Sequence, residues 1–195
     1  MKKILLLGGS SQQVIAIKTA KESGYYTVLC DYLPDNPGQY VADKFYLAST
    51  TDKDLILKIA KQENIDGVIS YVSDPAAPTA SYVAGELNLL GNSLSCVDTL
   101  CNKGKFRKFL EQNGFNTPHS LTFNQGVSVD TDALSHLRFP LIIKPVDSSG
   151  SKGVTVLESP QGLNQAISYA FEYSRSKTII VEEFVQKKHS YLIGG

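Results

Sequence analysis

The residues best suited to chemistry lie in one stretch, FPLIIKPVDSSGSKGVTVL, at positions 139–157. An apolar, strand-like run ends at Lys144, a loop of small residues follows at 147–153, and a β-branched run closes the stretch at 154–157. Glycines in such a loop let backbone N–H groups approach phosphate oxygens closely, and a lysine adds positive charge. We therefore predict a hairpin that folds over a polyphosphate, although the loop alone fits an ordinary exposed hairpin equally well.

A second group of cations precedes this hairpin. Lys103 stands where a helical pattern over 93–113 is expected to break, near 102–104, and Lys105, Arg107 and Lys108 follow it. Charged residues on a helix usually form a solvated face, and we interpret most of these four side chains in that way.

The elements that must position these residues begin with alternating apolar runs and helical patterns. This alternation predicts an α/β fold, with a Rossmann-like parallel sheet in the first part of the chain. Strands are expected at 2–7, 26–30, 44–47 and 67–71, and helices at 12–23, 52–63 and 74–87.

Several residues of this first part receive specific roles. Ser10 or Ser11 is expected to cap the first helix, which turns Val14, Ile15, Ile17 and Ala20 inward. Asp74 before Pro75 is typical of a helix start, and we favour capping over a site role for it.

The first turn argues against a dinucleotide site. It reads GGSSQQ and lacks the third glycine of a G-x-G-x-x-G fingerprint, although Asp31 stands where a ribose-binding acid would be. A small-molecule site at the carboxyl ends of these strands remains consistent with the topology.

The remainder of the chain predicts a smaller α+β lobe after Thr117-Pro118. We expect a strand at 120–123, a helix at 131–137, the hairpin, a helix that Ser159-Pro160 caps and that ends near 174, and a strand at 178–185. The expected domains are 1–115, 116–182 and a hinge at 183–195 that begins a further lobe. Because 191–195 would leave an apolar strand without a neighbour, we expect completion by a carboxyl-terminal half or by a second copy in a homodimer.

Composition excludes several classes of protein. The 195 residues are 42% hydrophobic and carry 19 basic and 19 acidic side chains, so nucleic acid is not an expected partner. Cys30, Cys96 and Cys101 have no metal-ligand spacing and fit reduced thiols in the cytoplasm. The apolar run at 4–7 is too short for a signal peptide, and no run reaches membrane-spanning length.

Taken in order, these motifs resemble the amino-terminal half of the ATP-grasp ligases, such as the carbamoyl-phosphate synthase large subunit, biotin carboxylase and D-alanine–D-alanine ligase. The matching segments cover almost the whole chain, and they are GGS at 8–10, GYYTV at 24–28, SDP at 73–75, NKGKF at 102–106, GF at 114–115, Pro118, FPLIIKP at 139–145, SSGSKGV at 148–154 and VEEFV at 181–185.

The resemblance implies roles for individual residues. Lys103 and Lys144 would bind ATP phosphates, and the loop from Ser148 to Gly153 would close over the β- and γ-phosphates. Adenine would contact the hinge at Glu182, Glu183 and Val185, and the ribose would lie near His189, for which a surface position fits equally well. The implied ATP-binding residues are Lys103, Lys144, Ser148, Ser149, Gly150, Ser151, Lys152, Gly153, Val154, Glu182, Glu183, Val185 and His189. The implied substrate site comprises Gly8, Gly9, Ser10, Ser73 and Asp74.

The implied reaction is attack of a carboxylate on the γ-phosphate of ATP, followed by displacement of phosphate by an amine or similar nucleophile. Positioning and charge neutralisation by lysines and Mg²⁺ would drive it. The resemblance places the metal ligands in a later lobe, so no residue here is assigned to catalysis or to metal, and the chain alone is not expected to turn over.

Two other hypotheses stay open. One is a non-catalytic nucleotide-binding or regulatory module with the same fold, and the other is a Rossmann oxidoreductase. A P-loop NTPase is excluded because SGSKG does not match G-x-x-x-x-G-K-[ST].

Overall fold

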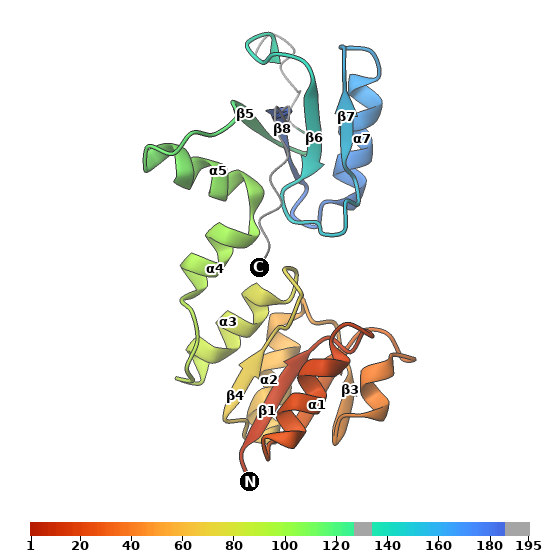
Figure 1. Ribbon diagram of the computed structural model, residues 1–195, viewed down its shortest axis with the longest axis vertical. Helices are drawn as coiled ribbons and strands as arrows, with labels where there is room; N and C mark the ends of the chain where they lie inside the picture. The colour runs from red at the N-terminus through yellow and green to blue at the C-terminus, as the bar shows by residue number, and fades with distance from the viewer. Residues whose placement is uncertain (127–133, 186–195) are drawn as a thin grey trace. The chain divides into compact units, whose positions relative to one another are not determined.

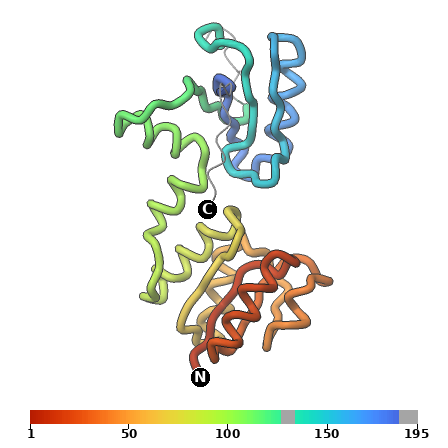
Figure 2. The backbone as a smooth tube through the Cα atoms, viewed as in Figure 1, coloured from red at the N-terminus to blue at the C-terminus, as the bar shows by residue number. Residues whose placement is uncertain are grey.

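The computed structural model describes residues 1–126 and 134–185. The chain divides into two compact units, Met1–Cys101 and Asn102–Gly195. Figure 1 shows the elements of each unit, and Figure 2 follows the backbone through them from red to blue.

The first unit is built on a parallel sheet. Its strands are β1 (Lys3–Leu7), β2 (Tyr26–Asp31), β3 (Lys44–Leu47) and β4 (Gly67–Ile69), in the order β3-β2-β1-β4. All three strand pairs are parallel, as predicted. This finding confirms the predicted α/β class with a Rossmann-like first part.

Helices cover both faces of this sheet. They are α1 (Val14–Glu22), α2 (Lys53–Glu63) and α3 (Ala77–Glu86), with a 3₁₀ turn, η1, at Pro37–Tyr40; α4 (Leu94–Cys101) packs on α3. Leu6 and Leu29 pack with Ile17 of α1, whereas Leu5 and Val28 belong to a core on the other side that includes α2 and α3. Because both faces are covered, the strands read as continuous apolar runs.

The predicted starts of two helices in the first unit, α1 and α3, are wrong. Neither Ser10 nor Ser11 caps α1: Gln13 precedes the helix and makes no side-chain capping bond. Ile15 is 56% exposed rather than inward-facing, because the helix buries Ile17 on its sheet side.

Asp74 is likewise not a helix cap. Helix α3 begins after Ala76, with a proline in its first turn. The backbone N–H groups of Ala76 and Ala77 both donate to the Ser73 carbonyl, so Asp74-Pro75 forms a turn ahead of the helix. The second proline, Pro78, gives the same start signal as Pro75 and lies closer to the true start.

The second unit is an antiparallel sheet with α7 packed on one face. Its strands are β5 (Ser120–Asn124), β6 (Leu141–Pro145), β7 (Thr155–Leu157) and β8 (Thr178–Glu183), in the order β5-β8-β6-β7. The predicted hairpin is the β6–β7 pair, in which Leu141 lies opposite Leu157. Helix α5 (Lys103–Gln112) precedes the sheet.

Helix α7 (Leu163–Tyr173) begins later than predicted. Gly162, in the left-handed region at φ 82°, precedes it and makes no side-chain capping bond, so Ser159 is not the cap. Of the helix predicted at 131–137, residues 131–133 lie outside the described part of the chain, as do His189 and the apolar run at 191–195. Leu134 and Leu137 are buried in the core beside Ile167 of α7.

The compact units place α5 with the second sheet rather than with the first. The Lys103 N–H donates to the Val146 carbonyl at 2.9 Å, which ties the start of α5 to the end of β6. The predicted domain boundaries after residues 115 and 182 remain predictions. Within the described residues, no helix is long and apolar enough to cross a membrane.

A buried carboxylate in the first unit gives a stability prediction. Glu63 is 5% exposed, and its carboxylate accepts from Lys44 Nζ at 2.7 Å, from Tyr46 and from Lys3. Hydrogen bonds from Lys44 and Tyr46 lower the pKa of Glu63 to about 2. A depressed carboxylate pKa stabilises the fold above the unfolded value of about 4.3 and loses that effect as the pH falls toward the folded value.

We expect Glu63→Gln to reduce the free energy of unfolding at pH 7 by about 1–3 kcal/mol, near the lower end because Lys44 is partly exposed. The difference from wild type should shrink between pH 4 and pH 2. Urea unfolding followed by circular dichroism measures it, with the exposed Glu22→Gln as control. An equal difference at pH 7 and pH 3 would contradict the assigned cause.

Candidate functional site

Successive side chains of β6 and β8 point to opposite faces of the second sheet, and only one of these faces packs against α7. Leu141, Ile143 and Val181 belong to the core with α7. The alternate positions Ile142, Lys144 and Glu182 therefore project from the opposite face. Ile142 pairs directly with Glu182 in the β6–β8 register, so Lys144 lies diagonally across from that glutamate.

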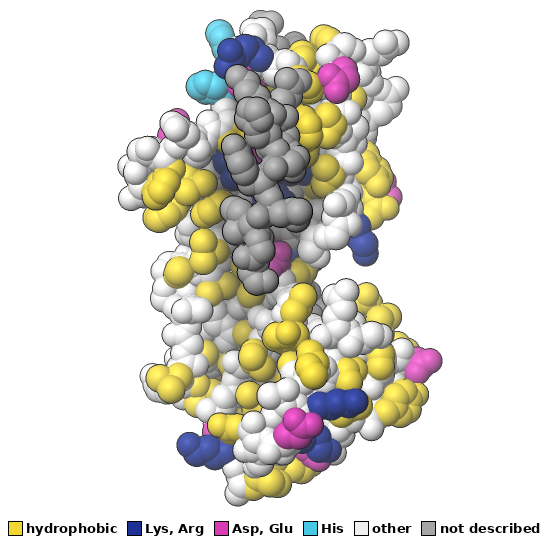
Figure 3. All heavy atoms as spheres, viewed as in Figure 1, with side chains coloured by type: hydrophobic (Ala, Val, Ile, Leu, Met, Phe, Trp, Pro, Cys, Tyr) yellow, Lys and Arg dark blue, Asp and Glu magenta, His cyan; other side chains and the backbone are white. Residues whose placement is uncertain are grey.

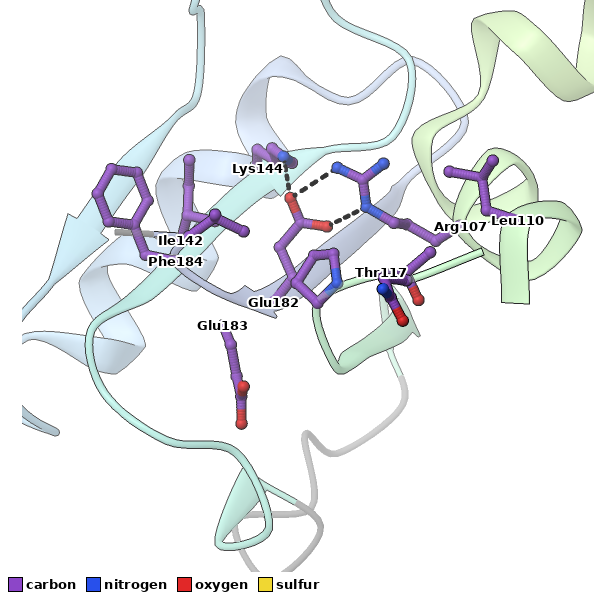
Figure 4. A pocket seen from close by; sticks show the side chains of 11 residues that line it. Arg107, Leu110, Thr117, Ile142, Lys144, Glu182, Glu183 and Phe184 are labelled. Atoms are coloured by element: carbon purple, nitrogen blue, oxygen red, sulfur yellow. Dashed lines mark hydrogen bonds and ion pairs between the residues drawn. The ribbon is translucent and has the colours of Figure 1, made fainter. Parts of the chain in front are cut away.

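The carboxylate of Glu182 is the centre of this face. Glu182 is 3% exposed, and it forms an ion pair with Lys144 Nζ through Oε1. Arg107 of α5 binds the same carboxylate with Nε at 2.9 Å from Oε2 and Nη2 at 3.3 Å from Oε1. Figure 4 shows the lysine and arginine side chains converging on the carboxylate.

Arg107 is the site residue that sequence reasoning missed. Its interpretation as part of a solvated face is wrong, because its side chain is only 24% exposed and is paired with Glu182. The available signal was its spacing: Arg107 follows Lys103 by four residues, which places both on one side of α5.

Lys103 lies beside the hairpin loop. Asn102 caps α5 by accepting from the Lys105 N–H at 3.0 Å, and this cap starts the helix at Lys103. The Nζ of Lys103 donates to the Ser148 carbonyl at 2.7 Å. The structure thus brings Lys103 to the beginning of the loop, whereas the side chain of Lys144 contacts Glu182.

The loop at 147–153 is held at its base and exposed at its tip. The Asp147 carboxylate accepts from Ser174 Oγ at 3.2 Å and from the N–H groups of Arg175 and Ser176 at 3.2 and 2.6 Å. Ser149 to Lys152 are exposed. The loop is therefore anchored to the turn between α7 and β8, and Ser149, Ser151 and Lys152 face solvent.

Gly153 closes the loop in a conformation that needs glycine. Its φ is 73°, and a Cβ there would lie 2.8 Å from Pro145 Cγ and 2.9 Å from Tyr173 Cβ. A side chain at this position would thus meet both backbone strain and close contacts, and it would displace Val154 and β7.

A pocket of about 280 Å³ opens beside the Glu182 cluster. Its lining combines the ionic side chains with apolar ones and with the end of β8, and it comprises Arg107, Leu110, Asn116, Thr117, Pro118, Ile142, Lys144, Glu182, Glu183, Phe184 and Val185. A concave apolar surface with a few convergent polar groups is the usual form of a small-molecule site.

The predicted hinge residues occupy different positions around this pocket. The Glu183 side chain points away from the Lys144–Glu182 pair in Figure 4. It accepts from the Arg138 N–H at 3.0 Å, and this hydrogen bond lowers the pKa of Glu183. Val185 is 71% exposed. His189 lies outside the described residues.

The predicted substrate residues lie at the carboxyl edge of the first sheet. The Gly9 N–H donates to Asp31 Oδ2 at 2.7 Å, and the Leu33 N–H donates to Oδ1 at 2.8 Å. Ser10 donates through N and Oγ to Gln13 Oε1, at 3.0 and 2.9 Å. Asp31 therefore holds the glycine turn through Oδ2 and its own following loop through Oδ1, so both oxygens that a dinucleotide ribose would need are already engaged.

Other parts of this edge are less enclosed. Ser73 is half-buried, and Asp74 is exposed in the turn before α3. Gly8 has φ 111°, and a Cβ there would lie 2.2 Å from the Gln13 amide nitrogen. The structure thus brings Gly8, Gly9 and Ser10 into one fixed turn, and it places Ser73 and Asp74 in the loop that follows β4.

A metal-ligand cluster or a basic patch would indicate another kind of site. The residues at 1–126 and 134–185 contain no group of three or more His, Cys, Asp or Glu side chains suited to a metal ion. On the face drawn in Figure 3, the described Lys and Arg side chains are separated and do not form one basic patch.

The anchoring of the loop by Asp147 can be tested directly. Asp147→Ala removes the acceptor for two backbone N–H groups and one hydroxyl, so amide exchange at 148–153 and 174–176 should accelerate by about tenfold or more. Hydrogen–deuterium exchange with mass spectrometry measures this effect, with the exposed Glu158→Ala as control. Unchanged exchange in both segments would show that the loop does not depend on Asp147.

The sequence of this chain is similar to those of several known proteins. Residues 109–190 match the family model described as D-ala D-ala ligase C-terminus. The chain is 32% identical over 189 residues to the formate-dependent phosphoribosylglycinamide formyltransferase of Prochlorococcus marinus strain NATL1A, covering 94% of this chain and 48% of that protein. It is 26% identical to the carbamoyl phosphate synthase large chain of Pseudothermotoga lettingae, covering 95% of this chain and 18% of that protein. The chain spans about half the length of the formyltransferase relatives.

Solved structures show the same fold. N5-carboxyaminoimidazole synthetase from Staphylococcus aureus, complexed with ADP, matches with a TM-score of 0.75 and 16% identity, over 96% of this chain and 48% of that one. The L-amino acid ligase of Bacillus licheniformis matches with a TM-score of 0.73 and 22% identity, over 95% of this chain and 44% of that one. The predicted resemblance to the ATP-grasp ligases is therefore confirmed, and the chain spans 44% to 48% of the matched formyltransferase, synthetase and amino acid ligase chains.

Proposed function

We propose that this chain supplies the nucleotide-binding part of an ATP-dependent, ADP-forming ligase that joins a carboxylate to an amine or similar nucleophile. The observation that carries the proposal is the convergence of Lys144 and Glu182 in one pocket, together with the contact that Lys103 makes to the Ser/Gly loop at Ser148. The family relationship supports the reaction class.

The residues present fit a nucleoside triphosphate. Lys103 and Lys144 offer two ammonium groups, and a lysine serves such a site as a flexible point charge. The loop from Ser148 to Gly153 adds hydroxyl and backbone donors at an exposed tip. When bound, ATP supplies the phosphoryl group that turns the carboxylate into an acylphosphate, which the nucleophile then attacks with release of phosphate.

The end of β8 is proposed to hold the adenine. The Glu183 and Phe184 N–H groups already donate to the carbonyls of His119 and Pro140, at 3.0 and 2.8 Å. The exposed backbone around Val185 is therefore the segment that we expect to read the ring edge. Glu182 lines the same pocket, which is consistent with its proposed contact to the exocyclic amine, and His189 remains proposed near the ribose.

The rest of the reaction needs groups beyond this pocket. We propose that Mg²⁺ binds to acidic residues and an asparagine in a further lobe, and that the carboxylate substrate binds at the edge formed by Gly8, Gly9, Ser10, Ser73 and Asp74. Cytoplasmic location and a homodimer likewise remain proposals.

Lys144→Ala tests the site assignment. Loss of one ammonium–phosphate interaction should weaken ATP binding by about 10- to 100-fold in the full-length gene product, since hydrogen bonds to charged groups are worth about 1.5–3 kcal/mol. Isothermal titration calorimetry measures the affinity, and circular dichroism checks the fold. The exposed Lys108→Ala is the matched control, and unchanged ATP affinity in Lys144→Ala would refute the assignment.

A second experiment tests where the metal site lies. The 195-residue chain by itself should form no ADP from Mg²⁺-ATP above the spontaneous rate, because the proposed metal ligands are outside it. A coupled pyruvate kinase–lactate dehydrogenase assay measures ADP. Robust Mg²⁺-dependent ADP formation would contradict the proposal.

A further inference from the structure

Helix α5 carries two cations that contact different parts of the second unit. Lys103 contacts the loop at the Ser148 carbonyl, and Arg107, one helical turn later, contacts the hinge strand at Glu182. The Lys103 contact fits the implied phosphate role. The Arg107 contact has no counterpart among the roles that the resemblance implies, and it therefore needs its own explanation.

The two cations on Glu182 are bound in different ways. Arg107 uses Nε and Nη2 on separate carboxylate oxygens, in the two-point geometry of a planar guanidinium. Lys144 uses a single ammonium on Oε1, an oxygen that Arg107 also contacts. Lys144 can therefore leave while both oxygens keep a partner.

The second cation on Glu182 is important because the carboxylate is buried. The side chains of Glu182, Lys144 and Arg107 are 4%, 13% and 24% exposed. A buried carboxylate that loses its only cation is strongly destabilised, because solvent does not replace the lost partner. With Arg107 absent, any departure of Lys144 would leave Glu182 in that condition.

We propose that Arg107 is a positioning residue that holds Glu182 neutralised while Lys144 exchanges this carboxylate for a nucleotide phosphate. The inference rests on the proposed function, since it takes Lys144 to be a phosphate ligand. Arg107 itself contacts no phosphate in this scheme. It lowers the free-energy cost of moving Lys144 and keeps Glu182 oriented in the pocket.

The choice of arginine follows from the geometry. A lysine at position 107 would retain the charge but would offer one compact donor in place of a fork, so it could not occupy both oxygens in the same way. A methionine would keep much of the apolar stem and remove the charge. These two variants therefore separate charge from bidentate geometry.

The test is a double-mutant cycle for ATP affinity in the full-length gene product. Arg107→Met should weaken ATP binding by about tenfold in the wild-type background, and Arg107→Lys by less. In an E182Q background, Arg107→Met should change the affinity by less than about twofold, because no buried negative charge is left for it to hold. The exposed K108M variant on the same helix is the control.

The outcomes separate this inference from the proposed function. An equal loss from Arg107→Met in both backgrounds would overturn the inference, because the effect of Arg107 would then not depend on the charge of Glu182. No loss in either background, with Lys144→Ala still impaired, would also overturn it and leave the proposed function standing. Unchanged affinity in Lys144→Ala would overturn both.

Urea unfolding guards against a purely structural effect. If Arg107→Met lowers the stability too far, Arg107→Lys with and without E182Q carries the same comparison. A general loss of structure would weaken ATP binding in both backgrounds, whereas the proposed role predicts a loss that depends on the charge of Glu182.

Discussion

The buried carboxylate of Glu182 is the constraint on which the arrangement of the second unit depends. A charge at this depth requires cations on both oxygens, and they come from β6 and α5, two elements that are distant in sequence. The same contact fixes the helix beside the sheet and holds Lys144 at the pocket. The ionic cluster thus contributes to the fold of the unit and also limits how its lysine can be used.

Much of the architecture could be predicted from local patterns. Continuous apolar runs at β1 and β2 indicate a sheet covered on both faces, and the Gly/Ser stretch between two β-rich runs indicates the β6–β7 hairpin. Helix starts were less predictable, because Ser10 and Asp74 carry capping side chains whose neighbours offer competing bonds. Such competition is decided by tertiary contacts, which a local pattern does not contain.

The candidate site was only partly predictable. Lys144 and Glu182 follow from motif order, and strand alternation explains why both project from one face. The role of Arg107 could not be read from the sequence, since a cation on a helix has the same local pattern whether it faces solvent or a buried carboxylate. The partner lies 75 residues away in the chain, and the packing of α5 beside β8 is needed to bring it near.

The two-sided second sheet has a consequence for how such a protein can change over time. Leu141, Ile143, Ile179 and Val181 of β6 and β8 fill the core with α7, whereas the alternate residues Ile142, Lys144 and Glu182 line the pocket. Substitutions that retune the pocket can therefore accumulate beside core residues without reshaping the core. This alternation separates the residues that shape the pocket from the residues that hold the scaffold, so the two sets can change independently.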